Sequence, residues 1–368
     1  MKIPTASRHH PRASRTTRPG RGRRSLGLGA AVLTGCLMLG PAHAAASVRP
    51  FVLERSIMMP TVPTGPYSDY LTVDLTGNRL FATPQAAKSV AVIDLNDGRV
   101  LRMIPDIGNP HGVFYSPKLA RLFVADGKNG DVKVFSGKSY SLIKTIPLAR
   151  GADGFSYDPH AKWLYVNNGG EDAGMKHAQI SIVDTVRMET VADIPISTSD
   201  LEASVIDSRK QLLYVNLVNQ SEVAVVDLKT RRVVKRWKLP AGEHTNIAIA
   251  LDTARSRLYV GCRDSSMRGS LVVLNSADGR PVATLPIGGW VDGISLDPKR
   301  QRVYASTGVG YIDTYAVEPG DVYRRLPDVP TAVMAKTSFY SSELDRMYVS
   351  VPHLGDTPAQ ILVFKPTR

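Results

Sequence analysis

The fold can be predicted from one stretch of the sequence, Leu213-Tyr214-Val215-Asn216 followed by Val223-Ala224-Val225-Val226-Asp227-Leu228. Both runs are rich in β-branched and aromatic residues, which favour strands. The same arrangement, an Asp or Ser turn residue with an aromatic residue seven positions later, recurs along the chain. The aromatics are spaced 42, 42, 49, 45, 45 and 44 residues apart, and they are Phe81, Phe123, Tyr165, Tyr214, Tyr259, Tyr304 and Tyr348. This regular period predicts a protein of seven repeated units.

A proline follows an apolar residue near the end of each unit, as in Ile146-Pro147 and Leu239-Pro240. Because proline lacks the N–H that a central ladder needs, it indicates an outer edge strand. Each unit therefore predicts four short antiparallel strands, which is the size of one propeller blade. We expect an all-β fold, a seven-bladed β-propeller of four-stranded antiparallel blades.

The two ends of the chain predict how the ring closes. The last unit stops at its third strand, Ile361-Leu362-Val363-Phe364, and lacks a fourth. The β-rich run Phe51–Ile57 precedes the first unit and has no partner there. We expect this N-terminal strand to complete the last blade, because that pairing removes the open edges of the ring.

The repeats also carry a family resemblance. Leu164-Tyr165-Val166-Asn167-Asn168 and Leu213-Tyr214-Val215-Asn216 resemble the YVTN β-propeller repeat of YncE-like exported bacterial proteins. Blades six and seven depart from this pattern, because Tyr304-Ala305-Ser306 and Tyr348-Val349-Ser350 lack the Asn. The resemblance implies a seven-bladed ring and export, and it implies no particular reaction.

The basic charge of the chain comes largely from its first residues. The formal net charge is +13, but residues 1–44 hold eight of the 46 Lys and Arg residues and no acidic residue. The rest of the chain has 38 basic and 33 acidic residues. So small an excess argues against a nucleic-acid partner, which needs a basic phosphate-binding surface.

Residues 1–44 have the parts of a cleavable signal peptide, with a basic start, an apolar stretch and an A-x-A site before Ala45. Arg23-Arg24 resembles a twin-arginine signal. A lipobox-like Cys36 is the less favoured alternative, because the apolar run continues after it. We expect a periplasmic or secreted protein whose mature chain, 45–368, is one propeller domain without a transmembrane segment. A closed ring leaves no open sheet edge that a partner subunit would have to cover, so we expect a monomer.

Polar residues mark the start of each innermost strand, five positions before each turn residue. Six of these seven positions are ionisable, and in chain order they are Asp69, His111, Asp153, Glu202, Ile247, Asp292 and Lys336. Propeller geometry brings them to the mouth of the central channel. Asn246 adjoins the apolar member, and Trp290 precedes Asp292 closely enough to stack on a ligand. Except for Ile247, these residues form the candidate ligand-binding set.

Asp153, Glu202 and Asp292 are the candidate metal ligands, because carboxylate oxygens bind divalent cations such as Ca²⁺. Two of the three are followed by glycine, which lets backbone or ligand approach closely. The alternative is a solvated channel mouth, in which the same side chains cap turns and bind water. The sequence thus predicts a polar cluster at the channel mouth and leaves open whether the cluster binds a metal ion or only water.

Two functions fit these residues. The first is an exported binding or scaffold module, whose top face recognises a small-molecule ligand or a protein partner. The alternative is a metal-assisted hydrolase or lyase, lactonase-like in architecture, with a cation at the acidic channel mouth polarising a carbonyl. The sequence leaves open whether the protein is an enzyme.

Overall fold

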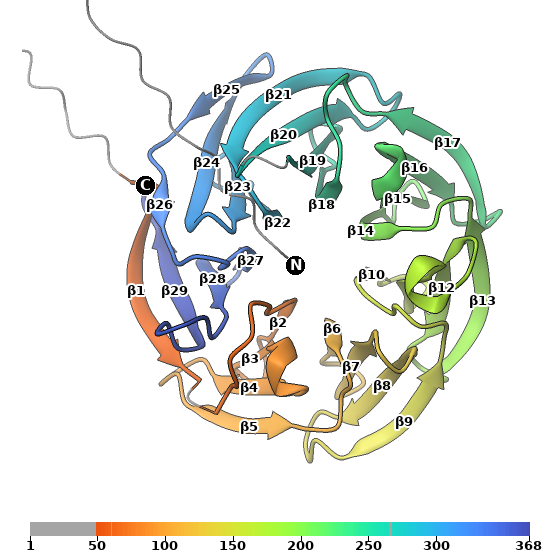
Figure 1. Cartoon of the computed structure of the whole chain (residues 1–368), viewed down its shortest axis with the longest axis vertical. Coiled ribbons are helices and arrows are strands. Elements are labelled where there is room, and N and C mark those ends of the chain that lie inside the picture. Colours follow the sequence, from red (N-terminus) through yellow and green to blue (C-terminus); the bar gives the residue numbers. More distant parts are fainter. Residues whose placement is uncertain (1–48, 60, 265–266) are drawn as a thin grey trace, which may run out of the picture. The chain divides into compact units, whose positions relative to one another are not determined.

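The predicted propeller is confirmed by the computed structural model, which describes residues 49–59, 61–264 and 267–368. Seven sheets of antiparallel strands stand in a ring around a common centre (Figure 1). The expected leader and its cleavage site lie outside the described residues. Within the described part of the chain, no helix is long and apolar enough to cross a membrane.

Each blade runs from an innermost to an outermost strand. The innermost strands of blades one to seven are β2 (Leu71–Asp74), β6 (Pro110–Ser116), β10 (Phe155–Asp158), β14 (Leu201–Asp207), β18 (Asn246–Asp252), β22 (Val291–Asp297) and β27 (Thr337–Ser341). The second strands are β3 (Arg79–Ala82), β7 (Arg121–Asp126), β11 (Trp163–Gly169), β15 (Leu212–Leu217), β19 (Arg257–Arg263), β23 (Arg302–Thr307) and β28 (Arg346–Val351). The third strands are β4 (Val90–Asp94), β8 (Asp131–Ser136), β12 (Ala178–Asp184), β16 (Glu222–Asp227), β20 (Arg268–Asn275), β24 (Tyr311–Glu318) and β29 (Gln360–Pro366). The outermost strands are β5 (Val100–Ile104), β9 (Leu142–Pro147), β13 (Glu189–Ile196), β17 (Arg232–Lys238), β21 (Pro281–Gly288), β25 (Val322–Arg325) and β1 (Phe51–Met58).

Blade six departs slightly from the four-stranded pattern. It carries a fifth, two-residue strand, β26 (Val329–Pro330), which pairs with β24 beyond the end of the short β25. Short 3₁₀ helices lie in three of the connections between second and third strands. They are η1 (Gln85–Ala87), η2 (Gly170–Ala173) and η3 (Val218–Gln220).

The expected closure of the ring is confirmed. β1 pairs antiparallel with β29, from Phe51 opposite Pro366 to Met58 opposite Gln360. Blade seven thus takes its outermost strand from the N-terminal side of the ring and its other three from the C-terminal end. Because this strand bridges the two ends of the repeat array, unpairing it would open the ring.

The repeated aromatic residues form the core between blades. All seven are at most 3% exposed. Each lies on a second strand and packs against the following blade, as Tyr165 does against Leu213 and Val215. The Tyr214 hydroxyl also donates a hydrogen bond of 2.8 Å to the Ser276 carbonyl of blade five. The period that defines the repeat is therefore the period of the interfaces between blades.

The Asn of the repeat links neighbouring blades. The Asn167 amide donates to the Glu202 carbonyl at 2.5 Å. The Asn216 amide donates to the carbonyls of Ile247 and Ala248 at 2.9 and 3.2 Å. In each case a second strand is tied to the innermost strand of the next blade.

Serine makes the equivalent link where the repeat lacks Asn. The Ser306 hydroxyl bonds that of Ser338 at 2.6 Å, between blades six and seven. The Ser350 and Ser68 hydroxyls lie 2.5 Å apart, between blades seven and one. Blades six and seven therefore keep the contact between neighbouring blades although their repeats have Ser in place of Asn.

Candidate functional site

The residues predicted at the channel mouth lie together. A cavity of about 330 Å³ is lined by the whole predicted series of innermost-strand positions, Asp69, His111, Asp153, Glu202, Ile247, Asp292 and Lys336. Each sits within two residues of the start of its innermost strand. Because the blades repeat the same geometry around one axis, equal positions in the repeat meet at the centre. We call this face, which also carries the loops between second and third strands, the top face.

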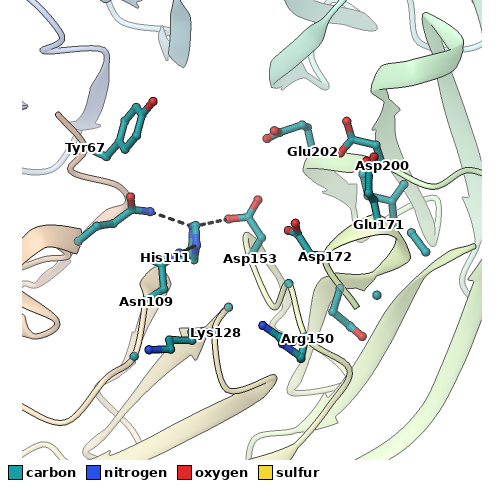
Figure 2. A pocket seen from close by; sticks show the side chains of 18 of the residues that line it. Tyr67, Asn109, His111, Lys128, Arg150, Asp153, Glu171, Asp172, Asp200 and Glu202 are labelled. Carbon is teal, nitrogen blue, oxygen red and sulfur yellow. Dashed lines mark hydrogen bonds and ion pairs between the residues drawn. The ribbon is translucent and has the colours of Figure 1, made fainter. Parts of the chain in front are cut away.

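A larger cavity of about 760 Å³ adjoins the first over blades one to four. His111, Asp153 and Glu202 line both cavities. Figure 2 shows basic side chains, including Lys128 and Arg150, along one side of this pocket and acidic ones along another. The acidic side is formed by Glu171, Asp172, Asp200 and Glu202.

His111 is held between two carboxylates at the junction of the cavities. Its Nδ1 lies 2.6 Å from Asp69 Oδ2 and 3.2 Å from Asp153 Oδ1. Burial alone would lower the pKa of His111, but the hydrogen bonds and charges of Asp153 and Asp69 outweigh it and raise the pKa to about 11. At neutral pH the ring is therefore an imidazolium. Burial raises the pKa of Asp153, and its contact with His111 opposes that shift.

The acidic side of the larger cavity holds carboxyl groups that are not paired with cationic side chains of the protein. Among the described residues, Glu171, Asp172, Asp200 and Glu202 have no cationic partner within ion-pair distance. Burial, then the charges of Asp172 and Glu171, raise the pKa of Asp200. Burial and the charges of Asp153 and Asp292 raise the pKa of Glu202 well above its ordinary value. These shifts record mutual repulsion in a partly desolvated space.

Asp292 is neutralised by two cationic side chains. Arg263 Nη2 bonds its Oδ1 at 2.7 Å, and Lys336 Nζ bonds its Oδ2. Two cations therefore compete with any ion for this carboxylate. Among the described residues, the three ligating groups that do converge, within 4.8 Å of one another, are Asp69, His111 and Asp153. This set shares only Asp153 with the sequence-predicted metal ligands Asp153, Glu202 and Asp292.

Two residues of the predicted ligand-binding set lie outside both cavities. The Asn246 side chain is fully buried, and it donates to Asn216 Oδ1 at 3.1 Å and to the Glu222 carbonyl at 2.9 Å. It joins blades four and five. Trp290 is 41% exposed, and the Arg263 guanidinium lies 5.7 Å from its ring centroid. Its ring is thus engaged by a cation at the rim.

The glycines that follow His111, Asp153 and Asp292 allow other parts of the protein to approach closely. A Cβ on Gly112 would lie 2.5 Å from the Asp153 carbonyl oxygen, and one on Gly293 would lie 2.9 Å from Ser338 Oγ. A Cβ on Gly154 would lie 2.5 Å from the Tyr70 hydroxyl. Close approach of the next blade explains Gly112 and Gly293, and the Tyr70 side chain of blade one occupies the space beside Gly154.

Sequence reasoning missed residues that the second strands bring to the same place. Gln85 and Arg263 both line the channel mouth. Each lies four positions after the aromatic residue of its repeat, Phe81 and Tyr259. A comparison of the positions four residues after the repeated aromatics, made in the same way as for the innermost positions, would have found them.

Comparison with known sequences identifies similar proteins for part of the chain. It is 29% identical over 97 residues to the uncharacterized protein YncE of Salmonella typhi, and 28% identical over 97 residues to YncE of Salmonella typhimurium. These matches span 26% of this chain and 27% of each YncE protein. The expected resemblance to YncE-like propellers is confirmed. No family model matches the chain.

Solved structures similar to this YncE-like chain are similar in fold alone. A chain of Kuenenia stuttgartiensis hydrazine synthase superposes with a TM-score of 0.69 at 17% identity, covering 83% of this chain and 96% of that one. The WD40 repeats of RRP9 give a TM-score of 0.67 at 13% identity, covering 85% and 97%. A chain of the mitotic checkpoint complex gives 0.69 at 14% identity, covering 93% and 100%. At such low identity, function has to be argued from the site.

Proposed function

We propose that this chain is an exported propeller that binds a small polar ligand in the larger top-face cavity. Its volume of about 760 Å³ suits a small molecule. The position at the mouth of a closed ring supports binding, because the strands there are fixed by blades on both sides. Residues 1–44 would direct export and be cleaved, which would leave one propeller domain at 45–368, acting as a monomer.

Charge separation carries the proposal and indicates the ligand class. Lys128 and Arg150 line the same cavity as Asp200 and Glu202, yet no ion pair forms between the two groups among the described residues. Opposite charges that remain apart across a cavity can each bind the complementary group of one ligand. The ligand we propose is a zwitterion, with its cationic group toward Asp200 and Glu202 and its anionic group toward Arg150.

The test is a calorimetric and thermal-shift screen of free amino acids, polyamines and dicarboxylic acids. We expect amino acids or similar zwitterions to stabilise the protein by binding the folded state. The double variant Asp200→Asn with Glu202→Gln should weaken that binding at least tenfold. Glu189→Gln, an exposed change on the outermost strand β13, is the matched control and should have no effect.

Binding of dicarboxylic acids alone, or unchanged zwitterion binding in the double variant, would contradict the proposal. A screen in which no compound raises the melting temperature or releases heat of binding would also contradict the proposal. That result would favour a protein partner for the top face. Chemical turnover of a bound compound would instead favour the metal-assisted hydrolase or lyase.

A further inference from the structure

Three ligating side chains from three consecutive blades converge where the two cavities join. They are Asp69 before β2, His111 on β6 and Asp153 before β10, and their ligand atoms lie within 4.8 Å of one another. We propose that Asp69, His111 and Asp153 form a binding site for one divalent transition-metal ion. The site is independent of the zwitterion proposed above, because it uses none of the unpaired acidic or basic side chains of that cavity.

The arrangement of donor atoms supports a metal ion. Both carboxylates face the same ring nitrogen, with Asp69 Oδ2 and Asp153 Oδ1 at 2.6 and 3.2 Å from His111 Nδ1. Donors bound tetrahedrally to one ion at about 2.0–2.2 Å are separated by about 3.3–3.6 Å. The two carboxylate oxygens therefore need to move only a short way from the ring nitrogen for the three atoms to surround an ion.

The charge of the cluster also favours a cation. Two carboxylates face the single imidazole nitrogen at this point. Glu202, which lines both cavities, and Asp200, which lines the larger one, bring further carboxyl groups near the cluster. A divalent cation therefore complements the acidic groups of this part of the channel mouth.

Two amides complete the surroundings of the site. The Gln85 amide lies 3.2 Å from His111 Nδ1 and 3.3 Å from Asp69 Oδ2. Since its oxygen and nitrogen can exchange places by rotation, its carbonyl oxygen offers a fourth donor. The Asn109 amide lies 2.7 Å from His111 Nε2 (Figure 2). After the same rotation it would accept the Nε2–H and fix the ring for coordination through Nδ1.

The accessibility of the site and the type of its donor atoms limit which metal ion it would bind. The side chains of Asp69, His111 and Asp153 are 18%, 21% and 22% exposed, so an ion can enter from the cavity. Imidazole with carboxylates suits Zn²⁺, Mn²⁺ or Co²⁺, whereas Ca²⁺ takes six to eight oxygen ligands. The structure therefore favours a transition metal over the Ca²⁺ expected from carboxylates alone.

The test uses the chelator-treated full chain at mildly alkaline pH, where protons compete less with metal. Calorimetric titration with Zn²⁺, Mn²⁺ and Ca²⁺ measures affinity and stoichiometry, and the absorption spectrum of added Co²⁺ reports nitrogen coordination. We expect one transition-metal ion per chain and weak or absent Ca²⁺ binding. His111→Ala and Asp69→Asn should each weaken binding at least tenfold.

His177→Ala is the matched control, because His177 is an exposed top-face histidine between β11 and β12 that lies outside the cluster. It should bind metal as the unmodified chain does. Melting temperatures of all variants establish that they are folded, and Asp69→Asn preserves side-chain shape if His111→Ala fails to fold. Absence of transition-metal binding, or undiminished binding in folded Asp69→Asn and His111→Ala, would overturn the proposal. Metal binding and zwitterion binding are measured separately, so one proposal can fail while the other is supported.

Discussion

At the residue scale, Asn216 shows how one repeat residue holds two blades together. It is fully buried, its amide donates to two carbonyls of β18, and its oxygen accepts from Asn246. Asn216→Ala would leave these buried groups unpaired, so we expect it to lower the free energy of unfolding by about 1–3 kcal/mol. Urea denaturation measures this. Asn96→Ala, in an exposed turn, is the control, and an equal effect in both variants would contradict the interpretation.

A second residue-scale prediction concerns acid stability. Arg300 donates two hydrogen bonds to Asp345, of 2.7 and 2.8 Å, and these hold the pKa of Asp345 down at about 2. Because this folded-state pKa lies below the ordinary value of 3.8, the pair stabilises the fold above 3.8. The contribution is lost as the pH falls through about 2.

Asp345→Asn should therefore melt at a lower temperature than the unmodified chain at neutral pH, and the difference should shrink as the pH approaches 2. Thermal melts across a pH series test this. Asp356→Asn changes an exposed carboxylate in the β28–β29 connection and serves as the control. A difference that persists undiminished at the acid end would show that the pair acts by packing instead of charge.

At the element scale, β1 offers a test of ring closure within one strand. Ile57 is 3% exposed and belongs to the core between blades seven and one, whereas Leu53 on the same strand is 50% exposed. Ile57→Asp buries a charge and should cost about 3 kcal/mol or more of unfolding free energy. Leu53→Asp should change it by about 0.5 kcal/mol or less. Similar urea midpoints for the two variants would show that β1 contributes little to the closure.

At the scale of the whole molecule, the two ends of the ring permit rearrangement of the chain. Thr367 donates through its N–H to the Pro50 carbonyl at 2.9 Å and through its hydroxyl to the Arg49 carbonyl at 2.7 Å. A permuted chain, residues 61–368 followed by 49–59, would join β29 to β1 through a four-residue hairpin loop. Such loops are common between antiparallel strands.

We expect this permuted chain to fold into the same ring, with a melting temperature within a few degrees of the original. A chain lacking 49–59 should melt far lower, because blade seven then loses its outermost strand. Circular dichroism and thermal melts compare the two. If the permuted chain failed to fold while the original chain folds, the order of synthesis, and not the pairing itself, would govern closure.

The propeller, its seven blades and the strand that closes it could all be predicted from the sequence. This was possible because each repeat carries local signals of its own. Turn carboxylates such as Asp74 and Asp207 accept backbone N–H groups three residues later, and the aromatics recur at every blade interface. Because equal positions in successive repeats meet at the axis, the sequence also placed the series from Asp69 to Lys336 at the mouth of the channel.

The interactions of those side chains could be seen only in the folded chain. Folding pairs His111 with Asp69, neutralises Asp292 with Arg263 and Lys336, and buries Asn246 in the wall between two blades. The repeat period fixes which residues are neighbours. Charge pairing and burial depend instead on side-chain direction and on groups from other strands, and a single repeat does not encode them.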